Sequence, residues 1–204
     1  MATEKFFAGG DIGLVSDSSA LAIVGLSGRD ITLRDLLELR PERGRPLKLS
    51  AVIASFAERL AVFGLRSFMA DGWAREPARE YCTPLGIFIE QAPEGAAGKT
   101  AVYLATRDAL REGRLALGVN LRLRAQLRSI VSAPTSGGGL KISAPRRGGH
   151  GDLVSALVLA VHSATINAGY CGIPRPPNRG GNEGGDAARP RGAGFWGPGR
   201  RGFG

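Results

Sequence analysis

Three short apolar segments separated by turns occupy the first forty residues, and their order strongly constrains the fold. Residues 6–12 and 20–26 are each apolar, and a turn around Ser16, Asp17 and Ser18 joins them. In residues 31–40 apolar and polar side chains alternate, which is typical of a strand with one buried face. Consecutive strands with short links favour antiparallel pairing, so we expect a three-stranded meander.

After residue 46 the hydrophobic period changes from two to three or four, which predicts helices. The expected helices span residues 47–63, 76–81, 100–112 and 152–166; the expected strands span residues 66–71 and 86–90, and a hairpin spans residues 127–133 and 140–144. This order predicts an α/β, ribonuclease-H-like fold. Its mixed central sheet would have three antiparallel strands followed by parallel strands, flanked by helices and supplemented by the hairpin.

The chain is strongly basic for its 204 residues. Its 27 Lys and Arg residues exceed its 18 Asp and Glu residues, which gives a formal net charge of +9. Such an excess favours a polyanionic partner, nucleic acid first and an acidic membrane surface second; the alternative is a solvated surface with no partner. Cys82 and Cys171 are far apart and favour a reducing compartment. We expect a soluble protein because no apolar run approaches the roughly 20 residues that span a bilayer.

The composition changes at residue 169. Residues 169–204 are rich in Gly, Pro and Arg and poor in aliphatic side chains, so they cannot bury enough apolar surface to offset the entropy of ordering. We therefore expect one folded domain over residues 1–168 and a disordered basic tail over residues 169–204. Arg-Gly segments of this kind bind nucleic acid loosely, and a merely solubilising tail is the alternative.

Three aspartates stand at the ends of apolar elements: Asp11 in the first strand, Asp71 closing the fourth and Asp152 opening the last helix. If the first and fourth strands are neighbours, Asp11 and Asp71 converge, and a helix packed across the sheet can bring Asp152 to them. Hard divalent cations such as Mg²⁺ and Mn²⁺ relieve the repulsion between crowded carboxylates. Two such ions can support phosphodiester hydrolysis. The alternatives are structural: a turn cap for Asp11, an ion pair with Arg75 for Asp71 and a helix cap for Asp152.

Five short motifs follow one another along the chain: GDIG at residues 10–13, ADG at 70–72, RLAL at 114–117, GGGLKI at 137–142 and HGDLVSAL at 150–157. As an ordered set they resemble the nuclease domain of the large terminase subunit of tailed phages. The resemblance covers roughly residues 6–165. It implies a metal-dependent endonuclease that cuts concatemeric viral DNA during genome packaging in the host cytoplasm.

The resemblance also implies roles for individual residues. Asp11, Asp71 and Asp152 would be the catalytic metal ligands, with Asp11 bridging two ions. Asp17 is similar to an auxiliary acid near the metals, with turn capping as its alternative. His150 would contact a metal, a water molecule or the scissile phosphate, unless it is a structural histidine. Many relatives have an acid where this chain has Gly151, which leaves open whether a second ion binds.

The partners implied by the resemblance are double-stranded DNA, an ATPase motor, a small terminase subunit and the portal. This chain has no ATPase motif: GAAGKT at residues 95–100 lacks the first glycine of a phosphate-binding loop, whose position Pro93 occupies. We expect Gly98 to lie in a loop before a helix. The motor would then be an upstream part of the same polypeptide or a separate chain. The alternatives to a terminase nuclease are a Holliday-junction resolvase or transposase and a non-enzymatic basic nucleic-acid-binding protein.

Basic side chains gather around the predicted hairpin and suggest a track for the DNA backbone, with an ordinary solvated rim as the alternative. The expected DNA-contacting residues are Arg122, Arg124, Arg128, Lys141, Arg146 and Arg147. The glycines that flank Asp11 are expected to leave room for the phosphate backbone to approach.

Overall fold

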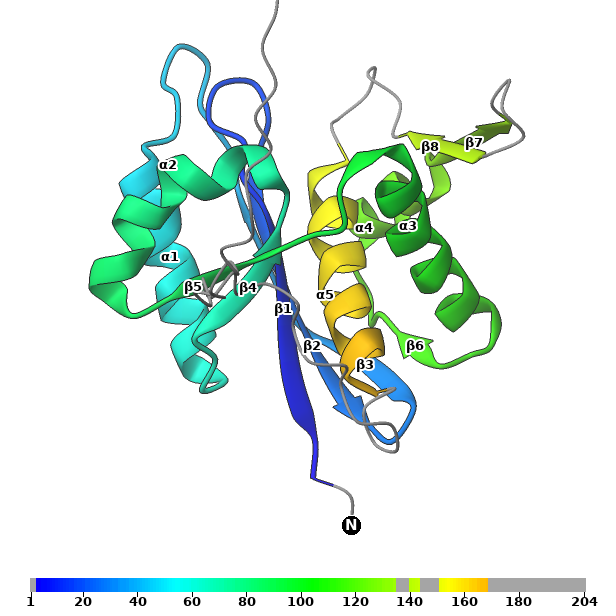
Figure 1. Cartoon of the computed structure of the whole chain (residues 1–204). Helices are drawn as coiled ribbons and strands as arrows, with labels where there is room; N and C mark the ends of the chain where they lie inside the picture. Colours follow the sequence, from blue (N-terminus) through cyan, green and yellow to red (C-terminus); the bar gives the residue numbers. More distant parts are fainter. Residues whose placement is uncertain (1–2, 135–139, 144–150, 169–204) are drawn as a thin grey trace, which may run out of the picture. The chain divides into compact units, whose positions relative to one another are not determined.

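A mixed sheet of six strands forms the centre of the computed structural model, which describes residues 3–134, 140–143 and 151–168 (Figure 1). The strand order is β5-β4-β1-β2-β3-β6. The first three strands pair antiparallel, which confirms the expected meander; they are β1 (Lys5–Asp11), β2 (Ser19–Ser27) and β3 (Asp30–Leu39). The predicted tail over residues 169–204 lies outside the described residues.

The remaining strands of the sheet are parallel to their neighbours. β4 (Ser67–Ala70) pairs with β1, and β5 (Phe88–Gln91) pairs with β4 on its other side. At the opposite edge the short β6 (Leu115–Ala116) pairs with β3, a strand that the sequence did not predict. The expected contact between the first and fourth strands is therefore confirmed.

Helices cover both faces of this sheet (Figure 1). The first layer contains α1 (Leu49–Val62) and α2 (Gly72–Cys82), which is followed by a short 3-10 turn, Thr83–Leu85. The second layer contains α3 (Gly95–Arg111), α4 (Leu121–Arg128) and α5 (Asp152–Ala168). A separate antiparallel pair, β7 (Val131–Pro134) and β8 (Leu140–Ser143), packs beside α3. The mixed α/β architecture is the one predicted.

The central strand β2 separates two hydrophobic cores. Its alternate residues Leu21 and Ile23 pack on the α1 side with Phe56, whereas Ala22 and Val24 pack on the α5 side. Because side chains alternate between the faces of a strand, both sets are buried. This explains why β2 is a continuous apolar run rather than an alternating one.

Helix α5 lies directly on the backbone of β1. A Cβ atom placed on Gly9 would overlap the backbone nitrogen of Ala160 and the backbone oxygen of Ala156. On the other face, a Cβ atom on Gly10 would lie 2.8 Å from the Phe68 ring. The expectation that these glycines leave room for a phosphate backbone was therefore wrong: Gly9 makes room for a helix, and Gly10 makes room for an aromatic ring.

The largest local correction is helix α4, which was not predicted: it covers residues 121–126, for which no element was expected, and residues 127–128, which were expected to begin a hairpin strand that instead begins at Val131. The Asn120 side chain caps this helix, since its Oδ1 accepts a hydrogen bond from the Leu123 N–H at 2.9 Å. Leu123 and Gln126 are buried, one helical turn apart. The apolar positions of this short segment are few, so no helix was predicted there.

Two other helix boundaries also differ from the expected ones. Helix α3 begins at Gly95, so Gly98 lies within the helix and not in a preceding loop. A Cβ atom on Gly98 would lie 2.6 Å from the Pro93 carbonyl carbon, so this glycine lets the preceding segment pack against the helix. Helix α2 is longer than residues 76–81 and contains Pro77. In the described part of the chain, no helix is long and apolar enough to span a membrane.

The contact between Gly9 and α5 predicts the effect of one added methyl group. We expect Gly9→Ala to lower the free energy of unfolding by about 3 kcal/mol, because the clash is with backbone that cannot rotate away. The control is Gly72→Ala, whose Cβ atom would lie 3.6 Å from the Glu94 carboxylate and should change stability by less than about 0.5 kcal/mol. Urea denaturation measures both, and equal midpoints for Gly9→Ala and the wild type would contradict the packing.

Candidate active site

Asp11 and Asp71 lie at the carboxyl ends of two adjacent parallel strands. Asp11 is the last residue of β1, Asp71 directly follows β4, and Gly10 and Ala70 are partners in the register between these strands. Asp11 is on the same face of β1 as Gly9, which is the face that α5 covers. Asp71 precedes α2 but its side chain does not cap that helix. The local fold therefore places both carboxylates at one end of the sheet.

Asp152 reaches the same end of the sheet from the start of α5. It is buried, and its Oδ2 accepts a hydrogen bond of 3.0 Å from the backbone N–H of Ser18, in the loop after β1. One turn further along α5, the Ser155 hydroxyl hydrogen-bonds to Asp11. The Tyr103 hydroxyl of α3 lies 3.5 Å from the Ser155 Oγ. Three separate parts of the chain thus meet around Asp11.

The carboxylates of Asp11, Asp71 and Asp152 interact electrostatically. The pKa of Asp11 is raised from 3.8 to about 7, first by burial, then by repulsion from Asp152 and, to a smaller extent, from Asp71. The hydrogen bond from Ser155 and the positive charge of Lys99 lower the pKa of Asp11. Burial also raises the pKa of Tyr103, with smaller contributions from Asp11 and Asp71. Asp11 is therefore a largely buried acid in a field of negative charge.

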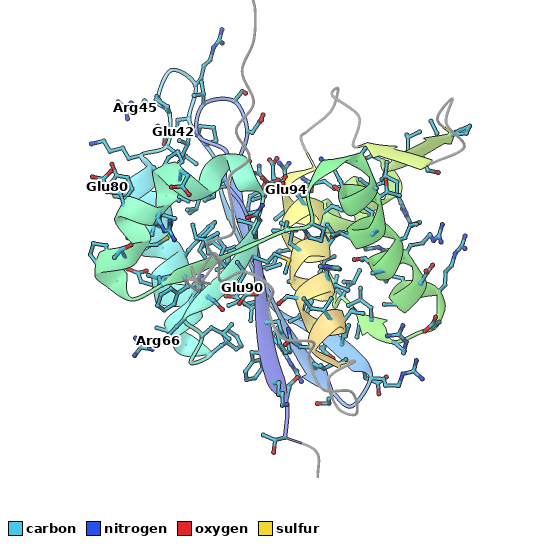
Figure 2. The ribbon with its side chains drawn as sticks, in the orientation of Figure 1. Glu42, Arg45, Arg66, Glu80, Glu90 and Glu94 are labelled. Atoms are coloured by element: carbon cyan, nitrogen blue, oxygen red, sulfur yellow. The ribbon has the colours of Figure 1, made fainter. Side chains whose placement is uncertain are left out.

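A cavity of about 430 Å³ lies beside Asp71. Lys99 lines it, and Glu94 at the start of α3 lines it as well. Figure 2 shows Glu94 at this end of the sheet, between α2 and α5. A smaller cavity of about 20 Å³ brings Asp71, Lys99, Tyr103 and Ser155 together. The site thus has an open side lined by both acidic and basic groups.

The donor groups fit a divalent cation by their chemistry rather than by a preformed cage. In residues 3–134, 140–143 and 151–168, no group of three or more His, Cys, Asp or Glu side chains is arranged to hold a metal ion. The donors nevertheless suit a hard cation, because Asp11, Asp71 and Asp152 offer carboxylate oxygens. Burial first, and repulsion from Asp152 and Asp71 second, raise the pKa of Asp11, and a cation bound there would offset both effects.

The predicted metal site also includes Asp17 and His150. Asp17 lies in the loop between β1 and β2, where its Oδ1 accepts a hydrogen bond of 3.2 Å from the Ser16 hydroxyl. His150 lies outside the described residues. The roles predicted for both residues therefore stay predictions.

The predicted DNA-contacting arginines that the structure describes lie on α4, and of these only Arg128 was expected in a hairpin strand. Arg124 and Arg128 are exposed. Arg122 instead binds Glu38 of β3 at 2.8 Å. Although burial raises it, hydrogen bonds from Arg40 and Arg122 hold the pKa of Glu38 below its ordinary value. The Lys141 side chain and all of Arg146 and Arg147 lie outside the description.

Sequence reasoning missed several groups at the site. Glu94 directly follows the segment after β5, so an acid beyond a parallel strand was the signal that could have found it. Ser155 is three residues after Asp152, a spacing that shares one helix face. Tyr103 and the Ser18 N–H gave no sequence signal, because only the tertiary fold brings them to these acids.

Comparison with known structures identifies the fold. The nuclease of the large terminase from thermophilic phage G20c matches with a TM-score of 0.66 and 21% identity, over 78% of this chain and 82% of that chain. The large terminase nuclease domain of Thermus phage P74-26 matches with a TM-score of 0.64 and 21% identity, over 77% of this chain and 78% of that chain. The chain has the fold of a phage terminase nuclease domain.

The HK97 bacteriophage large terminase matches with a TM-score of 0.69 and 19% identity, over 79% of this chain but only 40% of that chain. Structures of the G20c nuclease with bound magnesium, cobalt and zinc also match. No protein-family model matches the chain, and no curated protein matches it. Among these comparisons, the likeness to terminases therefore rests on the fold.

The charge on Asp11 predicts how the stability of the metal-free protein depends on pH. Because its folded-state pKa of about 7 lies above the ordinary 3.8, this group's contribution to stability is complete below about pH 4 and is lost as pH rises to 7. The loss reaches on the order of 4 kcal/mol. We expect Asp11→Asn to be more stable than the wild type at pH 8 in a chelator, with the gain disappearing toward pH 4.

Urea denaturation of both proteins between pH 4 and pH 8 measures this difference. Asp108→Asn, at a half-exposed acid that pairs with Arg107, controls for the loss of one negative charge. A stability gain for Asp11→Asn that is equal at all pH values would contradict the raised pKa of Asp11 in the folded protein.

Proposed function

We propose that the chain is a metal-dependent DNA endonuclease, the nuclease domain of a phage large terminase. The observation that carries this proposal is the convergence of Asp11, Asp71 and Asp152 on one end of the sheet, in a fold shared with terminase nucleases. The sequence motifs and the fold are separate lines of evidence, and both support a terminase nuclease domain. The reaction is hydrolysis of a phosphodiester bond in concatemeric viral DNA, in the host cytoplasm.

Asp11, Asp71 and Asp152 would hold Mg²⁺ or Mn²⁺, and we propose that two ions bind. Magnesium, cobalt and zinc bind the G20c nuclease, which supports a divalent cation here. Such cations stabilise the charge on the attacking and leaving oxygens of a phosphodiester. Asp17 and His150 are proposed as auxiliary groups near this centre.

The chain's own groups position these ligands. The Ser155 hydroxyl donates to Asp11 and thereby favours the charged carboxylate that binds a cation. The Ser18 N–H fixes the orientation of the Asp152 carboxylate. Lys99 shares the larger cavity with Asp71, where an ammonium group suits a DNA phosphate. Binding, orientation and charge balance are thus supplied from the loop after β1 and from α3 and α5.

The proposed partners are double-stranded DNA, a terminase ATPase motor, the small terminase subunit and the portal. The chain covers 40% of the HK97 large terminase. It covers 39% of the large terminase of another thermophilic bacteriophage, which was solved in complex with ATP-gamma-S. A motor in the same polypeptide or in a separate chain would complete such a protein.

Plasmid nicking with Mn²⁺ tests the proposed activity. We expect Asp11→Asn and Asp71→Asn each to reduce the nicking rate at least about 100-fold, because each removes a cation ligand. Asp108→Asn is the matched control and should cut at the wild-type rate. Wild-type cutting by Asp11→Asn or Asp71→Asn would show that the site is wrong.

The choice of substrate separates the proposed terminase from its alternatives. A resolvase would prefer a four-way junction to linear duplex, and a terminase nuclease would not. A basic binding protein would lose its activity when residues 170–204 are deleted, whereas a nuclease should keep metal-dependent cutting. The junction test and the tail deletion test these alternatives independently of the Asp11 and Asp71 variants.

The exposed arginines of α4 predict a change in the salt dependence of DNA binding. Removing both Arg124 and Arg128 should reduce the slope of log affinity against log salt by about 2, since each phosphate contact contributes about 0.9. The control removes two exposed arginines, Arg45 and Arg79, from the side of the sheet that α1 and α2 cover. An equal slope for both double variants in a fluorescence-anisotropy titration would rule out the track on α4.

A further inference from the structure

Helix α5 begins without a capping side chain of its own. The carbonyl of Gly151 accepts a hydrogen bond of 2.7 Å from the Ser155 N–H, which makes Gly151 the residue that precedes the helix. Ser, Thr, Asp and Asn are favoured at this position because their side chains accept from the next N–H groups. Gly151 has no side chain, so these N–H groups need an acceptor from elsewhere.

Gln126 of α4 supplies that acceptor. Its Oε1 accepts from the Leu153 N–H at 3.1 Å and from the Val154 N–H at 3.3 Å. The side chain is 7% exposed, and its Nε2 has no partner among the described residues. The described hydrogen bonds of this buried amide are therefore both made to the start of α5.

These bonds lie immediately beside the candidate cation ligand Asp152. The two N–H groups that Gln126 binds belong to the two residues after Asp152, and the Ser18 N–H holds the Asp152 carboxylate itself. We propose that Gln126 is a positioning residue: by capping α5 it fixes the backbone from which Asp152 reaches Asp11, and it thereby sets the cation affinity of the site. This inference rests on the proposed function.

Loss of the cap has a specific physical consequence. Without Gln126 Oε1, two buried N–H groups at the start of α5 have lost their acceptor, which favours fraying of the first turn. The Asp152 carboxylate would then sample orientations that do not favour a shared cation. Groups that orient metal ligands typically change metal affinity by roughly 10- to 100-fold when they are removed.

The experiment titrates Mn²⁺ into the folded, full-length protein and follows free Mn²⁺ by electron paramagnetic resonance. We expect Gln126→Leu to weaken Mn²⁺ binding at least about tenfold. Gln126→Glu keeps acceptor oxygens at the same reach and should bind Mn²⁺ within about threefold of the wild type or more tightly. If Gln126→Leu fails to fold, Gln126→Asn replaces it, because its amide is one methylene too short to cap the helix.

The control is Val52→Ala, which removes buried volume from α1 in the core on the opposite face of the sheet. It should lower the melting temperature while leaving Mn²⁺ affinity unchanged. A Gln126→Leu variant that melts early but binds Mn²⁺ as the wild type does would reduce Gln126 to a structural cap and overturn the inference alone. A wild-type protein that binds no Mn²⁺ would overturn the proposed metal site, and this inference with it.

Discussion

The packing of α5 against β1 at Gly9 is the contact on which the rest of the site depends. Because Gly9 has no side chain, the backbone at Ala156 and Ala160 rests on the strand. Asp152 lies one helical turn before Ala156, and Asp11 lies two residues beyond Gly9 on the same face. A close crossing of helix and strand therefore brings two carboxylates to the same place, and Ser155 follows with its hydroxyl on Asp11. The acids meet because glycine and alanine let two backbones meet.

Crowding acids in this way costs stability, and the fold offsets that cost elsewhere. The sheet is buried on both faces, with Phe56 and Phe68 packed edge-to-face in one core and the apolar length of α5 in the other. Ser19 closes the loop after β1 by donating to the Gly13 carbonyl at 2.6 Å, so the Ser18 N–H faces Asp152 from a fixed loop. Rigid surroundings hold the three carboxylates in place while their charges repel one another.

The parts of this structure that were predicted from sequence are those that depend on local patterns. Two short apolar runs and one alternating segment predicted the meander, and the acids at the ends of apolar strands predicted that Asp11 and Asp71 would lie at one end of the sheet, because parallel neighbours end at one edge. Helix α4 was missed because the described buried residues of this short helix are only Leu123 and the polar Gln126, which leaves too few apolar positions to show a helical period. Gly9 was misread because its neighbour, α5, lies far away along the sequence. Contacts that arise only from tertiary packing leave no periodic pattern in the amino-acid sequence.

Helix α4 joins the two halves of the proposed activity. Its buried edge carries Gln126, which caps α5 beside Asp152, and its exposed edge carries Arg124 and Arg128, the proposed contacts to the DNA backbone. Arg122 does not share their role, because it binds Glu38 and so anchors the helix to β3. The ion pair with Glu38 of β3 and the Gln126 hydrogen bonds to α5 together give this helix a defined position relative to the sheet. DNA that follows its exposed edge would therefore be placed relative to the same helix that fixes the start of α5.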